Sequence, residues 1–108
     1  MTLLSSVVNL HNSKLFFSKN ELSKILDCYS TGVSKGSWKD YAIFFGKQEA
    51  SFYMFKHSLA SPYCILTKKL KNKKLITYIL KFHNNKKSKF QKIDDLIILL
   101  KRQELKII

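Results

Sequence analysis

The stretch "GSWKDYAIFFGKQEASFYMFK", from Gly36 to Lys56, decides the fold because the hydrophobic period changes to two within it. Aromatic and other strand-forming residues follow Gly36 in two runs that are separated by the turn sequence Gly-Lys-Gln. We therefore predict a β-hairpin with one strand over Trp38–Phe45 and a second over Ala50–Lys56. Gly46 suits the positive φ that tight hairpin turns often require.

The length of this turn determines which residues share a face of the sheet. With two loop residues, one face is apolar apart from a phenol, and we assign it to the core; it carries Tyr41, Ile43, Phe45, Ala50, Phe52 and Met54. The other face is mixed and half exposed; it carries Asp40, Ala42, Phe44, Ser51, Tyr53 and Phe55. A three-residue loop would exchange the pairing and undo this assignment.

A helix is predicted immediately before the hairpin. Ser18 and Glu21 have the spacing of a capping box, and Phe17 with Leu22 can form the hydrophobic staple around it. The helix covers about Lys19–Ser34, and Gly32 or Gly36 can end it. Its helically spaced apolar residues are Leu22, Ile25, Leu26, Tyr29 and Val33.

Two more strands and a second helix are predicted after the hairpin. The strands cover Tyr63–Lys68 and Leu75–Phe82, with the basic loop Lys69–Lys74 between them. Residues 83–92 then turn into the last helix, which Ser88 and Gln91 can cap. Its buried stripe consists of Ile93, Leu96, Ile97 and Leu100. The segments "KLFF" at 14–17 and "LKII" at 105–108 can form short strands.

These elements predict a two-layer α+β domain, in which a four-stranded antiparallel meander is flanked by an N-terminal and a C-terminal helix. We expect one domain over residues 15–108, preceded by a flexible segment over residues 1–14. The chain has 108 residues, which suffices for one small core.

The charge balance favours an anionic partner. The net charge is +13, from 20 basic and 7 acidic residues, and such a field attracts polyanions. AT-rich codons favour lysine, but they also favour glutamate, so codon drift does not explain the scarcity of acids. The chain lacks the apolar run of a membrane span and the basic start of a signal peptide. We therefore expect a cytoplasmic protein, in which Cys28 and Cys64 are reduced, buried thiols.

No pattern of catalytic chemistry is visible, so we expect neither an enzyme nor a metal or other cofactor. Paired carboxylates, phosphate-binding glycine loops and zinc-ligand spacings are missing, and His11, His57 and His83 lie far apart. Asp40 is the one acid without an evident capping or turn role. We expect it to bond backbone amides near Gly36 beside a partly buried Trp38, while a binding surface around Trp38, Lys39 and Asp40 remains the alternative.

The basic segments suggest a nucleic-acid interface. Two lysine clusters, 68–74 and 81–92, lie at opposite ends of the predicted sheet, and rings on the mixed face can stack bases between them. The alternative is a protein-interaction or homodimerisation module that uses the mixed aromatic face. The predicted site residues for RNA are Lys39, Lys56, Lys68, Lys69, Lys71, Lys73, Lys74, Lys86, Lys87, Tyr53, Phe55 and Tyr78.

Several motifs resemble a family of small alphaproteobacterial proteins known only as domain of unknown function number twenty-seven-ninety-four. The resemblance rests on "SKNELSKILDCYSTGVSKGSWKDYAIFF", "ASFYMFKH" and "PYCILTKK", and above all on the family's motif Gly-Glu-Trp-Arg-Asp-Tyr-Ala-Ile. The matching positions are Glu21, Leu22, Ile25, Leu26, Tyr29, Gly36, Trp38, Asp40, Tyr41, Ala42, Ile43, Phe55, Pro62 and Tyr63.

The chain departs from the family pattern at charged positions. Ser37 replaces a glutamate, Lys39 and Lys56 replace arginines, and His57 and Cys64 replace two further arginines. The resemblance covers about residues 15–68 well and the rest loosely. It implies membership of a family but no activity.

Overall fold

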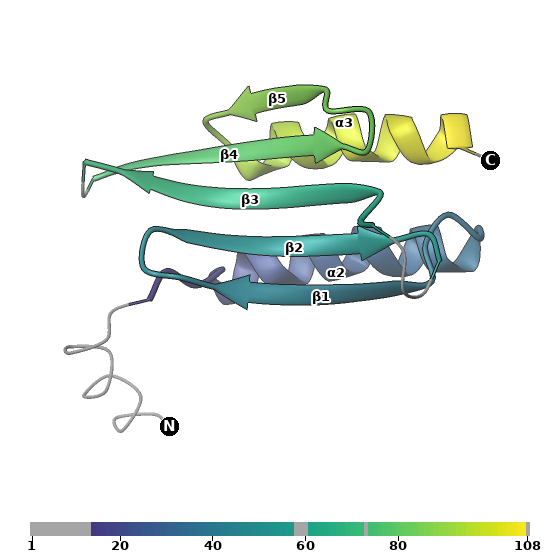
Figure 1. Ribbon diagram of the computed structural model, residues 1–108, viewed down its shortest axis with the longest axis horizontal. Coiled ribbons are helices and arrows are strands. Elements are labelled where there is room, and N and C mark those ends of the chain that lie inside the picture. The colour runs from purple at the N-terminus through teal and green to yellow at the C-terminus, as the bar shows by residue number, and fades with distance from the viewer. Residues whose placement is uncertain (1–13, 58–60, 73, 108) are drawn as a thin grey trace, which may run out of the picture.

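The computed structural model describes residues 14–57, 61–72 and 74–107, which form two helices and five strands (Figure 1). The predicted segment 1–14 lies outside these residues except for Lys14, and so does Lys73. In chain order the elements are α2 (Lys19–Ser34), β1 (Asp40–Phe45), β2 (Glu49–Phe55), β3 (Cys64–Lys71), β4 (Leu75–Phe82), β5 (Lys87–Phe90) and α3 (Ile93–Ile107).

The five strands form one antiparallel sheet in the order β1-β2-β3-β4-β5, and each pairs with its neighbours in the chain. Both helices lie behind this sheet in Figure 1, α2 behind β1 and β2 and α3 behind β4 and β5. One face of the sheet is therefore covered by helices, and we call the other the open face. The predicted α+β class is confirmed, but the sheet has five strands and not four.

The fifth strand corrects the prediction for the segment before α3. Ser88 is not a helix cap; it lies in β5 opposite Leu80, and Phe90 lies opposite Tyr78. The sequence "KSKF" alternates with period two, which suits an edge strand with one half-buried side. The helix starts only at Ile93.

Both predicted terminal strands are wrong as well. Residues 105–107 continue α3, while Ile108 lies outside the described residues. Residues 14–17 form no strand, although the Leu15 amide donates to the Gly46 carbonyl at 2.7 Å. This bond places the start of the described chain next to the end of β1.

The first helix begins and ends as its caps dictate. The Ser18 hydroxyl accepts from the Glu21 amide at 3.1 Å, and the Glu21 carboxylate accepts from the Ser18 amide at 2.7 Å, so the capping box is confirmed. At the other end Gly36 takes φ +83°, while the Ser37 amide bonds the Gly32 carbonyl at 2.7 Å. This is the Schellman arrangement. Val33 is 43% exposed and does not belong to the buried face.

The hairpin has the predicted register because its turn contains two residues between Gly46 and Glu49. Gly46 donates to Glu49 at 2.7 Å, and Ile43 lies opposite Phe52. Gly46 has no positive φ, however, so the reason predicted for this glycine is wrong. A side chain there would instead approach the Phe44 ring to 3.0 Å.

The core lies between the covered face and the helices. One row of side chains crosses the sheet from Ile43 through Phe52 and Leu66 to Leu80, and the last three are fully buried. Ile25 and Cys28 of α2 are fully buried in the same cluster. Cys64 also lies in it, as predicted for both cysteines. Truncating one such large side chain to alanine typically costs about 2–5 kcal/mol.

Candidate nucleic-acid interface

The open face presents aromatic and aliphatic side chains along its middle. Tyr53 lies between Ala42 of β1 and Ile65 of β3, and all of these side chains point away from the helices. Tyr53 and Ile65 are half buried, as is Phe55 near the end of β2. These three side chains do not belong to the core cluster, and neither described helix covers them.

Lysines lie at both ends of this face, as predicted. Lys69, Lys71 and Lys74 lie at the end where β3 turns into β4. Lys81 and Lys87 lie directly opposite each other at the other end, where β4 turns into β5. A strand of eight residues spans roughly 26 Å, so a ligand that touches both groups must extend along the strands.

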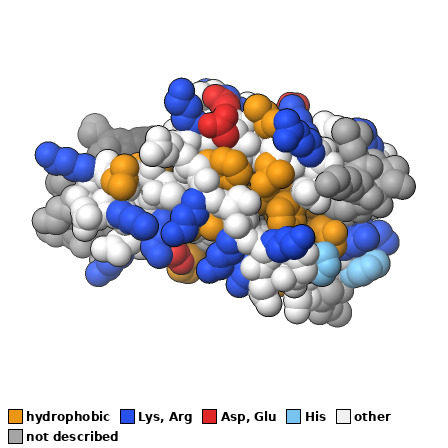
Figure 2. Space-filling model, turned by 90° about the horizontal axis from the view of Figure 1, so that it is seen from above, with side chains coloured by type: hydrophobic (Ala, Val, Ile, Leu, Met, Phe, Trp, Pro, Cys, Tyr) orange, Lys and Arg blue, Asp and Glu red, His pale blue; other side chains and the backbone are white. Residues whose placement is uncertain are grey.

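The edge formed by β5 and α3 carries the same charge. Figure 2 looks onto this edge and shows Lys and Arg side chains spread around a central group of hydrophobic side chains, with few acidic side chains between them. Lys86 and Lys89 are exposed in this region. The basic surface therefore continues from the open face around the β5 edge.

Two of the predicted site residues lie on the wrong side of the sheet. Lys68 and Tyr78 face each other across β3 and β4 on the covered face, and both contact Glu21. The Lys68 ammonium donates to the Glu21 carboxylate at 2.8 Å and to the Phe16 carbonyl at 2.9 Å. The Tyr78 hydroxyl donates to the second carboxylate oxygen. Neither side chain is available to a ligand on the open face.

This polar cluster joins the first turn of α2 to the sheet. Burial raises the pKa of the Glu21 carboxyl, but hydrogen bonds from Lys68, Tyr78 and the Ser18 amide outweigh burial, so the pKa of Glu21 is lowered. Burial and the neighbouring carboxylate raise the pKa of Tyr78. The raised pKa of Tyr78 and the lowered pKa of Glu21 both favour a protonated phenol that donates to an ionised carboxylate.

A second aromatic group lies at the end of the sheet where β3 begins. The Tyr63 ring stacks on His83 with centroids 4.3 Å apart, contacts Trp38 at 5.6 Å, and carries the Lys56 ammonium 5.4 Å from its centre. Hollows of about 250 and 210 Å³ flank His83. The Lys56 ammonium thus contacts the Tyr63 ring, whereas Lys39, whose backbone amide donates to the Phe55 carbonyl at 2.8 Å, is exposed.

The motif around Trp38 has structural roles. Trp38 is 1% exposed and belongs to the core. The Asp40 carboxylate accepts the Tyr41 amide at 2.8 Å, which differs from the predicted bond near Gly36 but is still a bond to backbone. The tryptophan therefore cannot form the exposed binding surface considered as the alternative.

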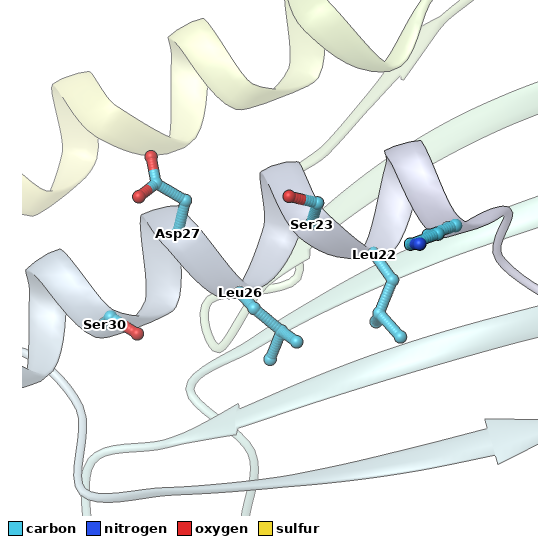
Figure 3. A pocket seen from close by; sticks show the side chains of 6 residues that line it. Leu22, Ser23, Leu26, Asp27 and Ser30 are labelled. Atoms are coloured by element: carbon cyan, nitrogen blue, oxygen red, sulfur yellow. The ribbon is translucent and has the colours of Figure 1, made fainter.

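A hollow of about 480 Å³ runs along α2, and its six lining residues all belong to that helix. In Figure 3 Leu22 and Leu26 point toward β1, whereas Asp27 points to the other side of the helix. A hollow built by a single helix holds no opposed catalytic groups. In the described part of the chain no three His, Cys, Asp or Glu side chains come together as a metal site would require. No helix in the same residues combines the length and apolar character of a membrane span.

Sequence reasoning missed part of the candidate interface. Ile65, Thr67 and Ile79 lie on the open face between the predicted rings and the lysines, and Ser51 bonds Thr67 across the strands at 3.0 Å. The alternation within "CILTKKLK" and "LITYILKF" contains this information. Lys68 and Tyr78 alternate in step with the buried residues of their strands. The strand register is needed to recognise that these two polar side chains also face the helices.

The comparisons with known proteins identify a family and nothing more specific. No curated protein and no solved structure matches the chain. A family model described as "Protein of unknown function (DUF2794)" matches residues 15–96, which include everything from the approach to α2 to the first turn of α3. Since this match covers more than half of the chain, the protein belongs to the DUF2794 family.

Proposed function

We propose that this protein is a cytoplasmic, non-enzymatic module that binds single-stranded nucleic acid, with RNA as its ligand. The observation that carries the proposal is the combination of accessible rings and flanking lysines on one uncovered sheet face. Bases would stack on Tyr53 and Phe55, and phosphates would lie against the lysines at the two ends. Lys68 and Tyr78 are left out because Glu21 holds both.

The arrangement of the lysines supports a polyanionic ligand. Lys81 lies directly opposite Lys87 on the open face, and like charges in such a pair destabilise a sheet. Lys69 and Lys71 are neighbours on the same face of β3, where Glu49 lies opposite Lys69 and offsets part of their charge. A phosphate backbone would relieve this repulsion, whereas an apolar protein surface would bury the charges without compensation.

The proposal is tested by titrating a labelled random single strand of about ten nucleotides, as RNA and as DNA, with the full-length protein. We expect binding near 50 mM salt that weakens linearly in log salt. Equal affinity for RNA and DNA would remove RNA as the preferred ligand. If neither strand binds near 50 mM salt, nucleic-acid binding is wrong, and the protein-interaction use of the open face takes its place.

A further inference from the structure

The two edges of the sheet are protected to different degrees. β5 is a short edge of four residues and carries Lys87 and Lys89. Short length and lysine side chains both discourage an edge strand from pairing with another chain. β1 is a six-residue edge, "DYAIFF", without lysine, proline or a bulge between Asp40 and Phe45. Among the described residues no strand pairs with the outer side of β1.

The register identifies the backbone groups on this outer edge. Gly46 donates to Glu49, and adjacent residues of a strand alternate between inner and outer bonding. The amides and carbonyls of Tyr41, Ile43 and Phe45 therefore point outward. The Asp40 carboxylate already accepts the Tyr41 amide, and no described residue accepts the Ile43 or Phe45 amide.

Exposed aromatic residues border the same edge on both faces of the sheet. On the open face Phe44 is 50% exposed. On the covered face Tyr41 is 44% exposed, and Phe16, which packs on Phe45 with ring centroids 4.8 Å apart, is 42% exposed. Three of the six large hydrophobic side chains that are exposed in the described chain thus surround β1.

We propose that the outer edge of β1 pairs antiparallel with β1 of a second copy of this chain, on a two-fold axis at Ile43, to form a continuous ten-stranded sheet. This inference is independent of the proposed function. In this register Ile43 lies opposite Ile43 of the second copy, Tyr41 opposite Phe45, and Ala42 opposite Phe44. Four hydrogen bonds between the copies form even while Asp40 holds the Tyr41 amide. A shift by one residue would place the outward-pointing groups of one copy opposite inward-pointing groups of the other, so the register can change only in steps of two residues.

The helix layer fits the same pairing. Strands lie about 4.8 Å apart, and α2 lies behind β1 and β2 (Figure 1). An α2 axis midway between those strands would lie about 10 Å from its symmetry mate, close to the distance of packed helices. Leu22 and Leu26, which point toward β1 in Figure 3, would line this contact.

In this arrangement unlike charges meet between the two copies of α2, whereas like charges meet at the two ends of the paired strands. The net charge is +13, so two copies repel each other wherever lysines meet. β1 itself carries no lysine, but in this register the exposed Lys39 lies opposite Lys47 of the second copy just beyond each end of the strand. The hollow along α2 has Lys19 at one end and Asp27 near the other, so an antiparallel copy brings unlike charges together.

The test compares two matched variants by sedimentation velocity over about 1–500 µM protein. Phe44→Lys places a charge beside the β1 edge, whereas Leu75→Lys changes a residue that is 55% exposed on the same face at β4. We expect the full-length protein to reach twice the monomer mass, Phe44→Lys to weaken association at least about tenfold, and Leu75→Lys to change it less than about twofold.

If Phe44→Lys misfolds, amide hydrogen exchange of the wild-type protein still tests the proposal. In the wild-type protein the Ile43 and Phe45 amides should become protected as the concentration rises, while the Tyr41 amide should be protected throughout. A protein that stays monomeric at every concentration, or equal weakening by both variants, would overturn the proposal. Protection of Ile43 and Phe45 that does not depend on concentration would show a different occupant of the edge and would also overturn it.

Discussion

Removing lysines from one end of the open face should reduce both the affinity for a single strand and its salt dependence. The substitution replaces Lys69, Lys71 and Lys74 by glutamine. Each engaged lysine contributes about 0.7 to the slope of log affinity against log salt, so three lysines contribute about 2. At about 0.1 M salt, the loss of these three lysine contributions should weaken binding of the single strand roughly hundredfold.

The control removes the same charge from the helix side. Lys19, Lys35 and Lys101 are exposed on or next to α2 and α3, away from the open face. Their replacement by glutamine lowers the net charge equally but removes no proposed phosphate contact. We expect this variant to change the slope by less than about half a unit, because the long-range field alone is screened beyond about 10 Å at 0.1 M salt.

The assay is fluorescence anisotropy of a labelled RNA strand at four or more salt concentrations, with the melting temperature measured for each variant. The replaced lysines are exposed except for Lys69, which is half buried, and surface lysines contribute little to stability, so both variants should melt near the wild-type temperature. If both variants reduce the slope of log affinity against log salt equally, the net charge of the protein binds RNA and no particular face of the sheet is involved. An unchanged slope in both would mean that these lysines do not contact phosphate, and the interface as drawn would be wrong.

Three further predictions concern single side chains. Tyr53→Ala should weaken RNA binding by about 1–3 kcal/mol in the same anisotropy assay while the salt slope stays unchanged; a changed slope would contradict stacking. Ser18→Ala should lower the free energy of unfolding by about 0.5–2 kcal/mol in urea, because the Glu21 amide loses its acceptor; an unchanged midpoint would refute the cap. Glu21→Gln should destabilise by about 1–3 kcal/mol at pH 7, because buried Lys68 loses a charged partner. Since folding lowers the pKa of Glu21, its contribution is present above about pH 4.5 and is lost as the pH falls through the folded-state pKa. The stability difference between wild type and Glu21→Gln should therefore shrink in acid, and a constant difference would refute the charged contact.

Local chemistry was sufficient to predict the first half of the fold. The capping box at Ser18 and Glu21 and the glycine at position 36 act within one turn of the chain, so the sequence alone places both ends of α2. The β1–β2 register follows in the same way from the two-residue turn and the alternation around it. Such signals do not depend on distant contacts, which is why they are visible before any tertiary structure is known.

The second half depended on contacts that the sequence does not display. "KSKF" is too short to be recognised as a strand from the sequence, although its alternation suits one, and pairing with β4 decides its structure. Lys68 and Tyr78 look like a surface lysine and a stacking ring, but strand parity turns them toward α2, where Glu21 compensates their burial. The partner that makes a buried lysine tolerable lies 47 residues away in the chain.

The sequence by itself therefore determined the fold class, the helix ends, the first hairpin and the strong positive charge. Tertiary structure decided which lysines and rings share the open face, because a strand's side chains alternate and only the full register assigns each one to water or to the helices. It also decided that β1 is the unprotected edge, since the exposure of an edge depends on which strand ends the sheet. Periodicity and capping act over a few residues, whereas faces and edges are properties of the assembled sheet.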